Sequence, residues 1–241
     1  MTTIYESLTA AIAAEQPVAV ATLVDESGQV GAKLLAYPGG ETLGSLGPGL
    51  PQQEIVRDML AMLARAESGI RSYPTRDGDV EVFVETYPPP PTMYIVGAVH
   101  IAIPLVSFAK TLGFRTVVVD ARGAFATPER FAHADELIAA WPDEALAGKL
   151  NSNSFVVLLT HDPKLDDPAL KVALPSPARY VGALGSPKTH TKRLARLRED
   201  GVPEEQLARL HAPIGLKIGA STPEEIAVSI IAEVVVARHG L

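Results

Sequence analysis

Cysteine is absent from this chain of 241 residues, and its absence excludes several kinds of chemistry. Without thiols the chain cannot form a disulfide, a thiolate metal site or a cysteine nucleophile, and it cannot carry a persulfide. Any sulfur chemistry in which the chain takes part must therefore use sulfur supplied by another molecule.

Long apolar runs and a positive net charge are missing as well. No segment approaches the roughly 20 uninterrupted apolar residues that a membrane span requires, and the N-terminus lacks the basic and then apolar order of a secretory signal. The net charge of −7 opposes binding to nucleic acid or to an anionic membrane, because both would be repelled over most of the surface. We therefore expect a cytoplasmic protein with no membrane span and no nucleic-acid partner.

Four consecutive prolines, at 88–91, divide the chain. Such a run is stiff and extended, and it can neither enter a helix nor donate hydrogen bonds to a sheet. With a hydrophobic content of 47%, the chain can bury one large core or two modest ones. We expect a smaller N-terminal α+β domain over residues 1–87, a linker over 88–92 and a second domain over 93–241.

The segment before the prolines mixes helical and alternating apolar patterns. Helices are predicted at 4–14 and 51–65, and strands at 18–24, 32–37, into Leu43, 70–73 and 80–85, with turns at Glu26–Gly28 and Arg76–Asp79. The loop Gly44–Gly49 contains three glycines. It suits either the close approach of a ligand or partner or a tight connection from strand to helix.

The segment after the prolines alternates strands and helices, which is typical of a Rossmann-like, doubly wound α/β sheet. Thr222 and Glu225 form a capping box that opens a final helix, expected to pack on the sheet. In a sheet with strands ordered 3-2-1-4-5, ligands bind outside the carboxyl ends of the first and fourth strands. The strands are predicted at 93–96, 116–119, 136–139, 155–159 and 179–183.

The turn after the fifth of these strands favours an anion site. Gly182 and Gly185 let the backbone turn and lie close to a ligand. Ser186 is a predicted N-cap, so the free N–H groups of the following helix face the same place as Lys188. The turn suits a bound phosphate, and the alternative is a capped surface helix with a solvated basic face.

Two histidines should reach the same edge of the sheet, His100 after the first strand and His161 after the fourth. With Asp162 they form either metal ligands or an acid–base pair, and the alternative is that they are structural residues with hydrogen-bond partners. The acidic run 162–167 is more typical of a loop or helix cap than of a cation site.

The loop after the first strand departs from the dinucleotide-binding pattern. A loop that binds a dinucleotide requires the pattern Gly-x-Gly-x-x-Gly. In Gly97–Ala102, Val99 stands where the second glycine would let a pyrophosphate approach the backbone. Asp120, about twenty residues further on, is well placed for a ribose hydroxyl, and Arg122 beside it for an extra phosphate. We therefore expect NAD(P) to be the less favoured ligand.

A set of motifs occurs in order and at suitable spacing in the second domain: Gly97–Ala102, Asp120–Arg122, Thr160–Asp162 with Asp166–Leu170, Tyr180–His190, His211–Leu216 and Thr222–Ile230. Together they closely resemble the xanthine dehydrogenase accessory factor family, also called the XdhC/CoxI family. Gly31–Lys33 and Gly44–Gly49 resemble the N-terminal domain of that family more loosely.

The resemblance implies an accessory factor that binds the molybdenum cofactor, as molybdopterin or its nucleotide form. Such a factor assists sulfuration of the cofactor and its insertion into an apo molybdenum hydroxylase of the xanthine or carbon monoxide dehydrogenase type. A cysteine desulfurase is an expected further partner, and a homodimer is expected. By similarity, the expected cofactor contacts are Gly97, His100, Asp120, Thr160, His161, Asp162, Gly182, Gly185, Ser186 and Lys188, and Arg122 joins them through its place beside Asp120.

The chain departs from the family pattern at three positions. Leu50 and Asp77 stand where many members have cysteines, and Val99 replaces a usual glycine. A cysteine-free member either binds and shields the cofactor while a separate desulfurase sulfurates it, or takes a different ligand. Two other functions stay open: an NAD(P)-dependent oxidoreductase with His100 or His161 as proton donor, and a nucleotide-binding adaptor without catalysis.

Overall fold

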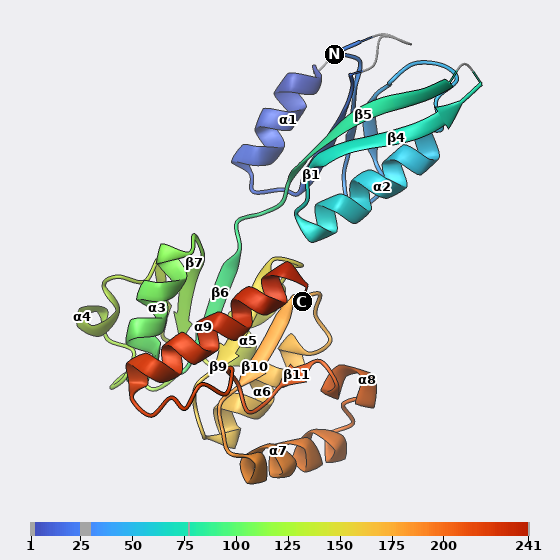
Figure 1. Ribbon diagram of the computed structural model, residues 1–241. Helices are drawn as coiled ribbons and strands as arrows, with labels where there is room; N and C mark the ends of the chain where they lie inside the picture. Colours follow the sequence, from blue (N-terminus) through green and yellow to red (C-terminus); the bar gives the residue numbers. More distant parts are fainter. Residues whose placement is uncertain (1–2, 25–29, 77, 241) are drawn as a thin grey trace. The chain divides into compact units, whose positions relative to one another are not determined.

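The computed structural model describes residues 3–24, 30–76 and 78–240, which form two compact units, Met1–Pro89 and Pro90–Leu241 (Figure 1). The predicted turn Glu26–Gly28 lies outside the described residues, as does Asp77 in the second predicted turn. Within the described ranges, no helix is both long and apolar enough to cross a membrane.

The first unit is a five-stranded antiparallel sheet with one helix on each face. The strand order is β3-β2-β1-β5-β4, and all seven elements lie close to their predicted positions. A capping box of Thr3 and Glu6 starts α1. The elements are α1 (Ile4–Ala13), β1 (Val18–Leu23), β2 (Lys33–Ala36), β3 (Thr42–Gly44), α2 (Gln52–Arg65), β4 (Gly69–Thr75) and β5 (Gly78–Tyr87).

The second unit is built on a six-stranded parallel sheet of order β11-β10-β9-β6-β7-β8. The predicted doubly wound order is confirmed, with β11 (Leu210–His211) as an added sixth strand. Two residues are too few to show a strand pattern, which is why the sequence did not reveal β11. The other strands are β6 (Thr92–Val96), β7 (Arg115–Val119), β8 (Glu136–Ile138), β9 (Ser154–Leu158) and β10 (Tyr180–Ala183).

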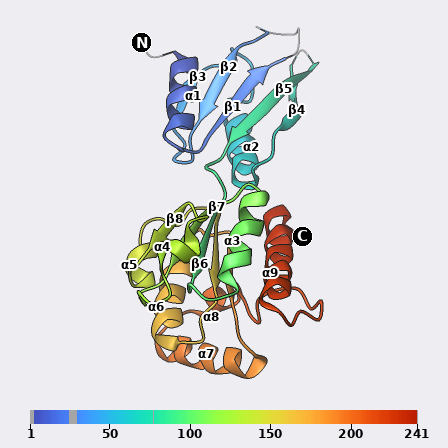
Figure 2. The same ribbon diagram turned by 90° about the vertical axis from the view of Figure 1, so that its left-hand side faces the viewer.

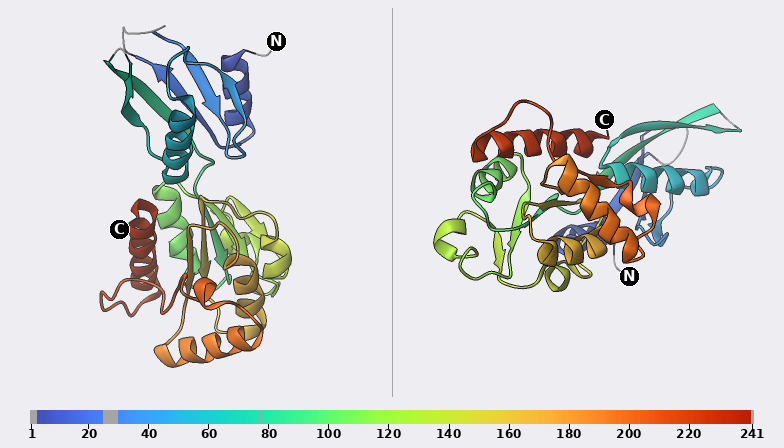
Figure 3. Two further views of the ribbon diagram at one scale, coloured as in Figure 1. Left: turned by 90° about the vertical axis from the view of Figure 1, so that its right-hand side faces the viewer. Right: turned by 90° about the horizontal axis from the view of Figure 1, so that it is seen from below.

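Helices cover both faces of this sheet. Figures 2 and 3 show α3 (Ala102–Thr111) and α9 (Pro223–His239) side by side on one face. The other face packs against α5 (Pro142–Leu146) and α6 (Pro163–Ala173), with further contacts from α7 (Pro187–Glu199) and α8 (Glu204–Leu207). The short α4 (Pro128–Phe131) follows β7. Alternate residues of β6, β7 and β9 enter the two cores, as expected for a parallel sheet buried on both sides.

The strand register aligns the carboxyl ends of the four central strands. Val96 pairs with both Val119 and Leu158, and Leu158 pairs with Ala183. The residues that follow β7, β6, β9 and β10 therefore begin at one level, which we call the carboxyl edge. Helix α7 lies at this end of the unit (Figure 1).

Phe155→Ala should lower the free energy of unfolding of the second unit by about 3–5 kcal/mol, because the surrounding core relaxes only partly around the cavity that the ring leaves. Phe155 is fully buried in β9, and its ring centroid lies 5.1 Å from that of Phe114. Urea unfolding followed by the fluorescence of Trp141, the one tryptophan of the chain, measures the change. Phe125→Ala, at a side chain that is 40% exposed, should cost less than about 1 kcal/mol. Equal losses in both variants would contradict the assigned core.

Candidate functional site

Gly97 and Thr160 lie against each other at the carboxyl edge. Gly97 has φ +109°, and a Cβ placed there would lie 2.6 Å from the Cγ2 of Thr160. A side chain at position 97 would therefore be strained by its backbone and would also clash. The two predicted site residues come together because β6 and β9 are neighbours in the sheet.

Asp120 points into the protein and organises the loops after β6 and β7. It accepts hydrogen bonds from Ala98 N (2.8 Å) and from Arg122 N (2.9 Å), Nε (2.9 Å) and Nη2 (2.8 Å). Burial raises the pKa of the Asp120 carboxyl, but the hydrogen bonds from Arg122 and Ala98 outweigh it and hold that pKa below its usual value. A ribose hydroxyl would have to displace one of these donors, and a ligand role for Asp120 stays a prediction.

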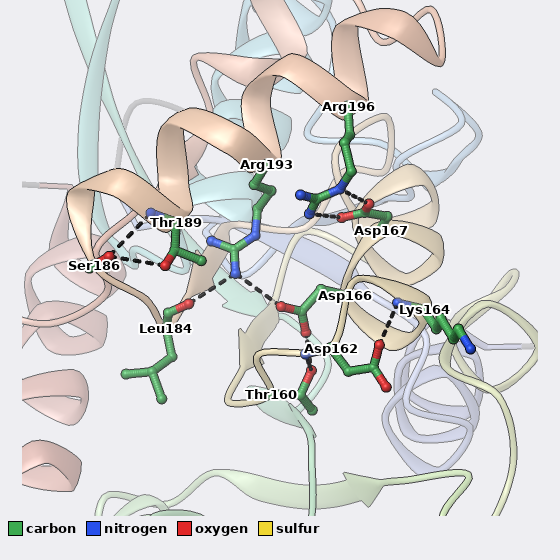
Figure 4. A network of polar contacts seen from close by, with 10 residues as sticks. All are labelled: Thr160, Asp162, Lys164, Asp166, Asp167, Leu184, Ser186, Thr189, Arg193 and Arg196. Carbon is green, nitrogen blue, oxygen red and sulfur yellow. Dashed lines mark hydrogen bonds and ion pairs between the residues drawn. The ribbon is translucent and has the colours of Figure 1, made fainter.

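A buried chain of polar contacts joins the ends of β9 and β10 (Figure 4). The Thr160 hydroxyl donates to Asp166 Oδ1, and Arg193 Nη2 donates to Asp166 Oδ2 at 2.9 Å. The same Nη2 donates to the Leu184 carbonyl oxygen at 2.9 Å. Asp166 and Arg193 are 2% and 1% exposed, so this ion pair lies fully inside the unit. It fixes the backbone where β10 turns toward α7.

Arg193 was not singled out in the sequence, because it falls in the basic stretch of α7. Two adjacent acids on α6 could have indicated that some cations of α7 are paired. Arg193 pairs with Asp166, and Arg196 pairs with Asp167 at 2.6 Å. Arg193 Nε and Nη1 are buried without a hydrogen-bond partner among the described residues. A Cβ on Gly185, where φ is +151°, would lie 3.8 Å from that Nη1.

The start of α7 offers several unused hydrogen-bond donors. As predicted, Ser186 is the N-cap and accepts from Thr189 N at 3.2 Å, and Pro187 is the first helical residue. In the part of the chain that the structure describes, the backbone N–H groups of Gly185, Ser186 and Lys188 make no hydrogen bond. Three donors at the positive end of a helix suit an anion.

The basic face of α7 divides into paired and unpaired cations. Arg193, Arg196 and Arg198 pair with carboxylates. Lys188 and Lys192, in the first two turns, have no ion pair with any described residue. The unbalanced positive charge of this helix is thus concentrated toward its N-terminus, at the carboxyl edge.

The structure places the remaining predicted residues as follows. His100, His161 and Lys188 are exposed, and their side chains make no hydrogen bond or ion pair within the described ranges. Asp162 caps α6 by accepting from Lys164 N at 3.0 Å, which confirms the helix-cap interpretation. Gly182 is buried in β10, where a Cβ would lie 2.7 Å from Ile214 Cδ1. Among the described residues, no group of three or more histidine or acidic side chains is arranged to hold a metal.

Asp120→Asn should lower the free energy of unfolding at pH 7 by about 1–3 kcal/mol, because an amide nitrogen would then face buried donors. Since the folded pKa of Asp120 is lowered, its contribution is complete above the ordinary value of 3.8 and is lost as the pH falls through the folded pKa. The difference between wild type and variant should therefore persist at pH 5 and shrink below pH ~3.8. Urea unfolding at a series of pH values tests this, and a difference that does not vary with pH would contradict it.

Arg193→Met should cost about 3–5 kcal/mol of unfolding free energy, because it leaves Asp166 buried without its cation. Adding Asp166→Asn removes that charge and should recover at least about 1 kcal/mol. Urea unfolding of the two single variants and the double variant measures the coupling. Simple addition of the two losses would show that the pair does not interact.

Two family models match the chain. The model described as XdhC Rossmann domain matches residues 93–234, and that described as XdhC and CoxI family matches residues 11–74. The uncharacterized protein YqeB of Escherichia coli strain K12 is 30% identical over 92% of this chain and 44% of its own length. A probable xanthine dehydrogenase subunit of Bacillus subtilis strain 168 is 31% identical over 79% of this chain and 53% of its own length.

A third relative matches a shorter part of the chain, and one solved structure shares its fold. The molybdenum cofactor insertion chaperone PaoD of Escherichia coli is 36% identical over 38% of this chain and 29% of its own length. A crystal structure described as a xanthine dehydrogenase from Bacillus halodurans covers 97% of this chain and 95% of its own, with a TM-score of 0.56 and 23% identity, which shows the shared fold. The chain spans about half the length of the first two relatives. Because the Rossmann-domain match alone covers more than half of it, the chain belongs to the XdhC and CoxI family.

Proposed function

We propose that this protein binds the molybdenum cofactor and takes part in the maturation of a molybdenum hydroxylase. The names of two relatives, one a cofactor insertion chaperone and the other a probable xanthine dehydrogenase subunit, support this role. The observation that carries the proposal is the start of α7 at the carboxyl edge. There the N–H groups of Gly185, Ser186 and Lys188 have no partner within the described residues.

These donors fit the phosphate of a pterin cofactor. Backbone N–H groups at a helix N-terminus bind phosphate directly, and the Lys188 ammonium adds a charge that no described carboxylate neutralises. In a chain with a net charge of −7, such a local excess of positive charge favours a small anionic ligand over a large polyanion. His100 and His161 belong to the loops that leave β6 and β9 at the same edge.

Because the chain has no cysteine, it has no thiol with which to carry sulfur to the cofactor. When bound, the cofactor supplies the molybdenum chemistry, and its terminal sulfido ligand comes from a sulfur donor outside this chain, such as a cysteine desulfurase. This chain holds and shields the cofactor and delivers it to the apo hydroxylase, a role that needs no catalytic residue. A homodimer stays a prediction, which the mass in solution tests.

Isolated molybdenum cofactor should bind stoichiometrically, and Lys188→Ala and His161→Ala should each weaken binding about tenfold or more. A hydrogen bond to a charged group contributes about 1.5–3 kcal/mol, which corresponds to that loss. Anaerobic titration followed by the absorbance of the cofactor measures the dissociation constants.

Lys149→Ala and His239→Ala are matched controls. Both side chains are exposed, Lys149 before the start of β9 and His239 at the end of α9, and binding should be unchanged in each. Unchanged binding in Lys188→Ala and His161→Ala would place the site away from the carboxyl edge. Binding of NADPH in preference to the cofactor would favour the oxidoreductase function instead.

A further inference from the structure

Arg122 and Phe125 form a partly exposed stacked pair that follows the carboxyl end of β7. The Arg122 guanidinium carbon lies 4.4 Å from the centroid of the Phe125 ring. The Arg122 side chain is 35% exposed and Phe125 is 40% exposed, so both remain accessible to a ligand. A guanidinium plane and an aromatic ring are the two kinds of side-chain surface on which nucleic-acid bases stack.

This surface is held rigidly in place. Two nitrogens of the Arg122 guanidinium donate to the fully buried carboxylate of Asp120, which fixes the plane of the group. Phe125 N donates to the Arg122 carbonyl oxygen at 2.9 Å, and Arg130 Nη1 donates to the Phe125 carbonyl oxygen at 2.9 Å. A group that is already ordered loses little entropy when a ligand binds.

The contact with Asp120 also changes what Arg122 can recognise. Because the carboxylate compensates the guanidinium charge, Arg122 attracts a further phosphate less than an unpaired cation such as Lys188 would. What the pair still offers a ligand is the outer face of the stack. Asp120 in turn acts by orienting Arg122, and recognition here does not require a ribose hydroxyl.

The distance across the sheet favours an elongated ligand. Strands β6 and β9 separate β7 from β10, so the platform and the start of α7 are three strand spacings apart, or about 14 Å. Between them, after β6, the backbone N–H groups of Val99, His100 and Ile101 make no hydrogen bond with any described residue. They offer donors for a second phosphate along the way.

We propose that Arg122 and Phe125 form a stacking platform for the base of a nucleotide-extended molybdenum cofactor. The proposal rests on the function proposed above and names the form of the cofactor that this chain takes. The base lies on the platform at the end of β7, and the phosphates lie against the N–H groups that follow β6 and β10. Phe125, which the sequence did not single out, is then a specificity-determining residue.

The test compares two ligands, molybdopterin and its nucleotide-extended form, on the full chain. Phe125→Ala should raise the dissociation constant of the nucleotide form roughly 5- to 100-fold, as expected from the loss of one stacked base, and leave that of molybdopterin unchanged. Phe125→Tyr keeps the ring and should bind both ligands like wild type. Tyr5→Ala removes an aromatic side chain that is 74% exposed in the first unit and should also have no effect.

The outcomes separate this inference from the function on which it rests. If wild type binds both ligands and Phe125→Ala leaves their ratio unchanged, or weakens both equally, the platform does not bind a base. If wild type prefers molybdopterin without the nucleotide, the inference is also overturned while the proposed function stands. If wild type binds neither ligand, the proposed function itself fails.

Discussion

The geometry of the candidate site depends on one buried ion pair, that of Asp166 with Arg193. It links α6 to α7 and, through Thr160 and the Leu184 carbonyl, ties the end of β9 to the end of β10. Enclosing two charges in a protein gains little net stability, so the contribution of this pair is chiefly positional. With Leu184 held, the backbone can turn at Gly185 and present the free N–H groups at the start of α7.

A second buried carboxylate, that of Asp120, likewise holds backbone in place, in the loops that follow β6 and β7. In a dinucleotide-binding protein, an acidic residue at this place accepts a hydrogen bond from the ribose. Here the carboxylate accepts hydrogen bonds from Ala98 and Arg122 instead. In this chain the Asp120 carboxylate orients the neighbouring Arg122 side chain, and a contact of Asp120 with a ligand stays a prediction. Together, the two carboxylates fix loops that follow β6, β7, β9 and β10 at the carboxyl edge.

Local signals in the sequence predicted most of the fold. The cap formed by Ser186, the capping box of Thr222 and Glu225, and the apolar pattern of each longer strand depend on residues within a few positions of one another. The elements therefore lie where the sequence indicates, and their alternation was enough to give the strand order. The two-residue β11, by contrast, carries too little pattern to be predicted in this way.

By itself, then, the sequence determined the doubly wound sheet, the start of α7 at its Ser186 cap and the absence of any thiol, and it indicated the family. Only the tertiary structure decided that Arg193 lies inside, that Asp120 faces Arg122 and Ala98, and that Arg122 stacks on Phe125. Asp166 and Arg193 are 27 positions apart, and Asp120 and Ala98 are 22 apart. Such contacts depend on how strands and helices pack, because a charged side chain has the same identity in the sequence whether it ends in solvent or in an internal pair.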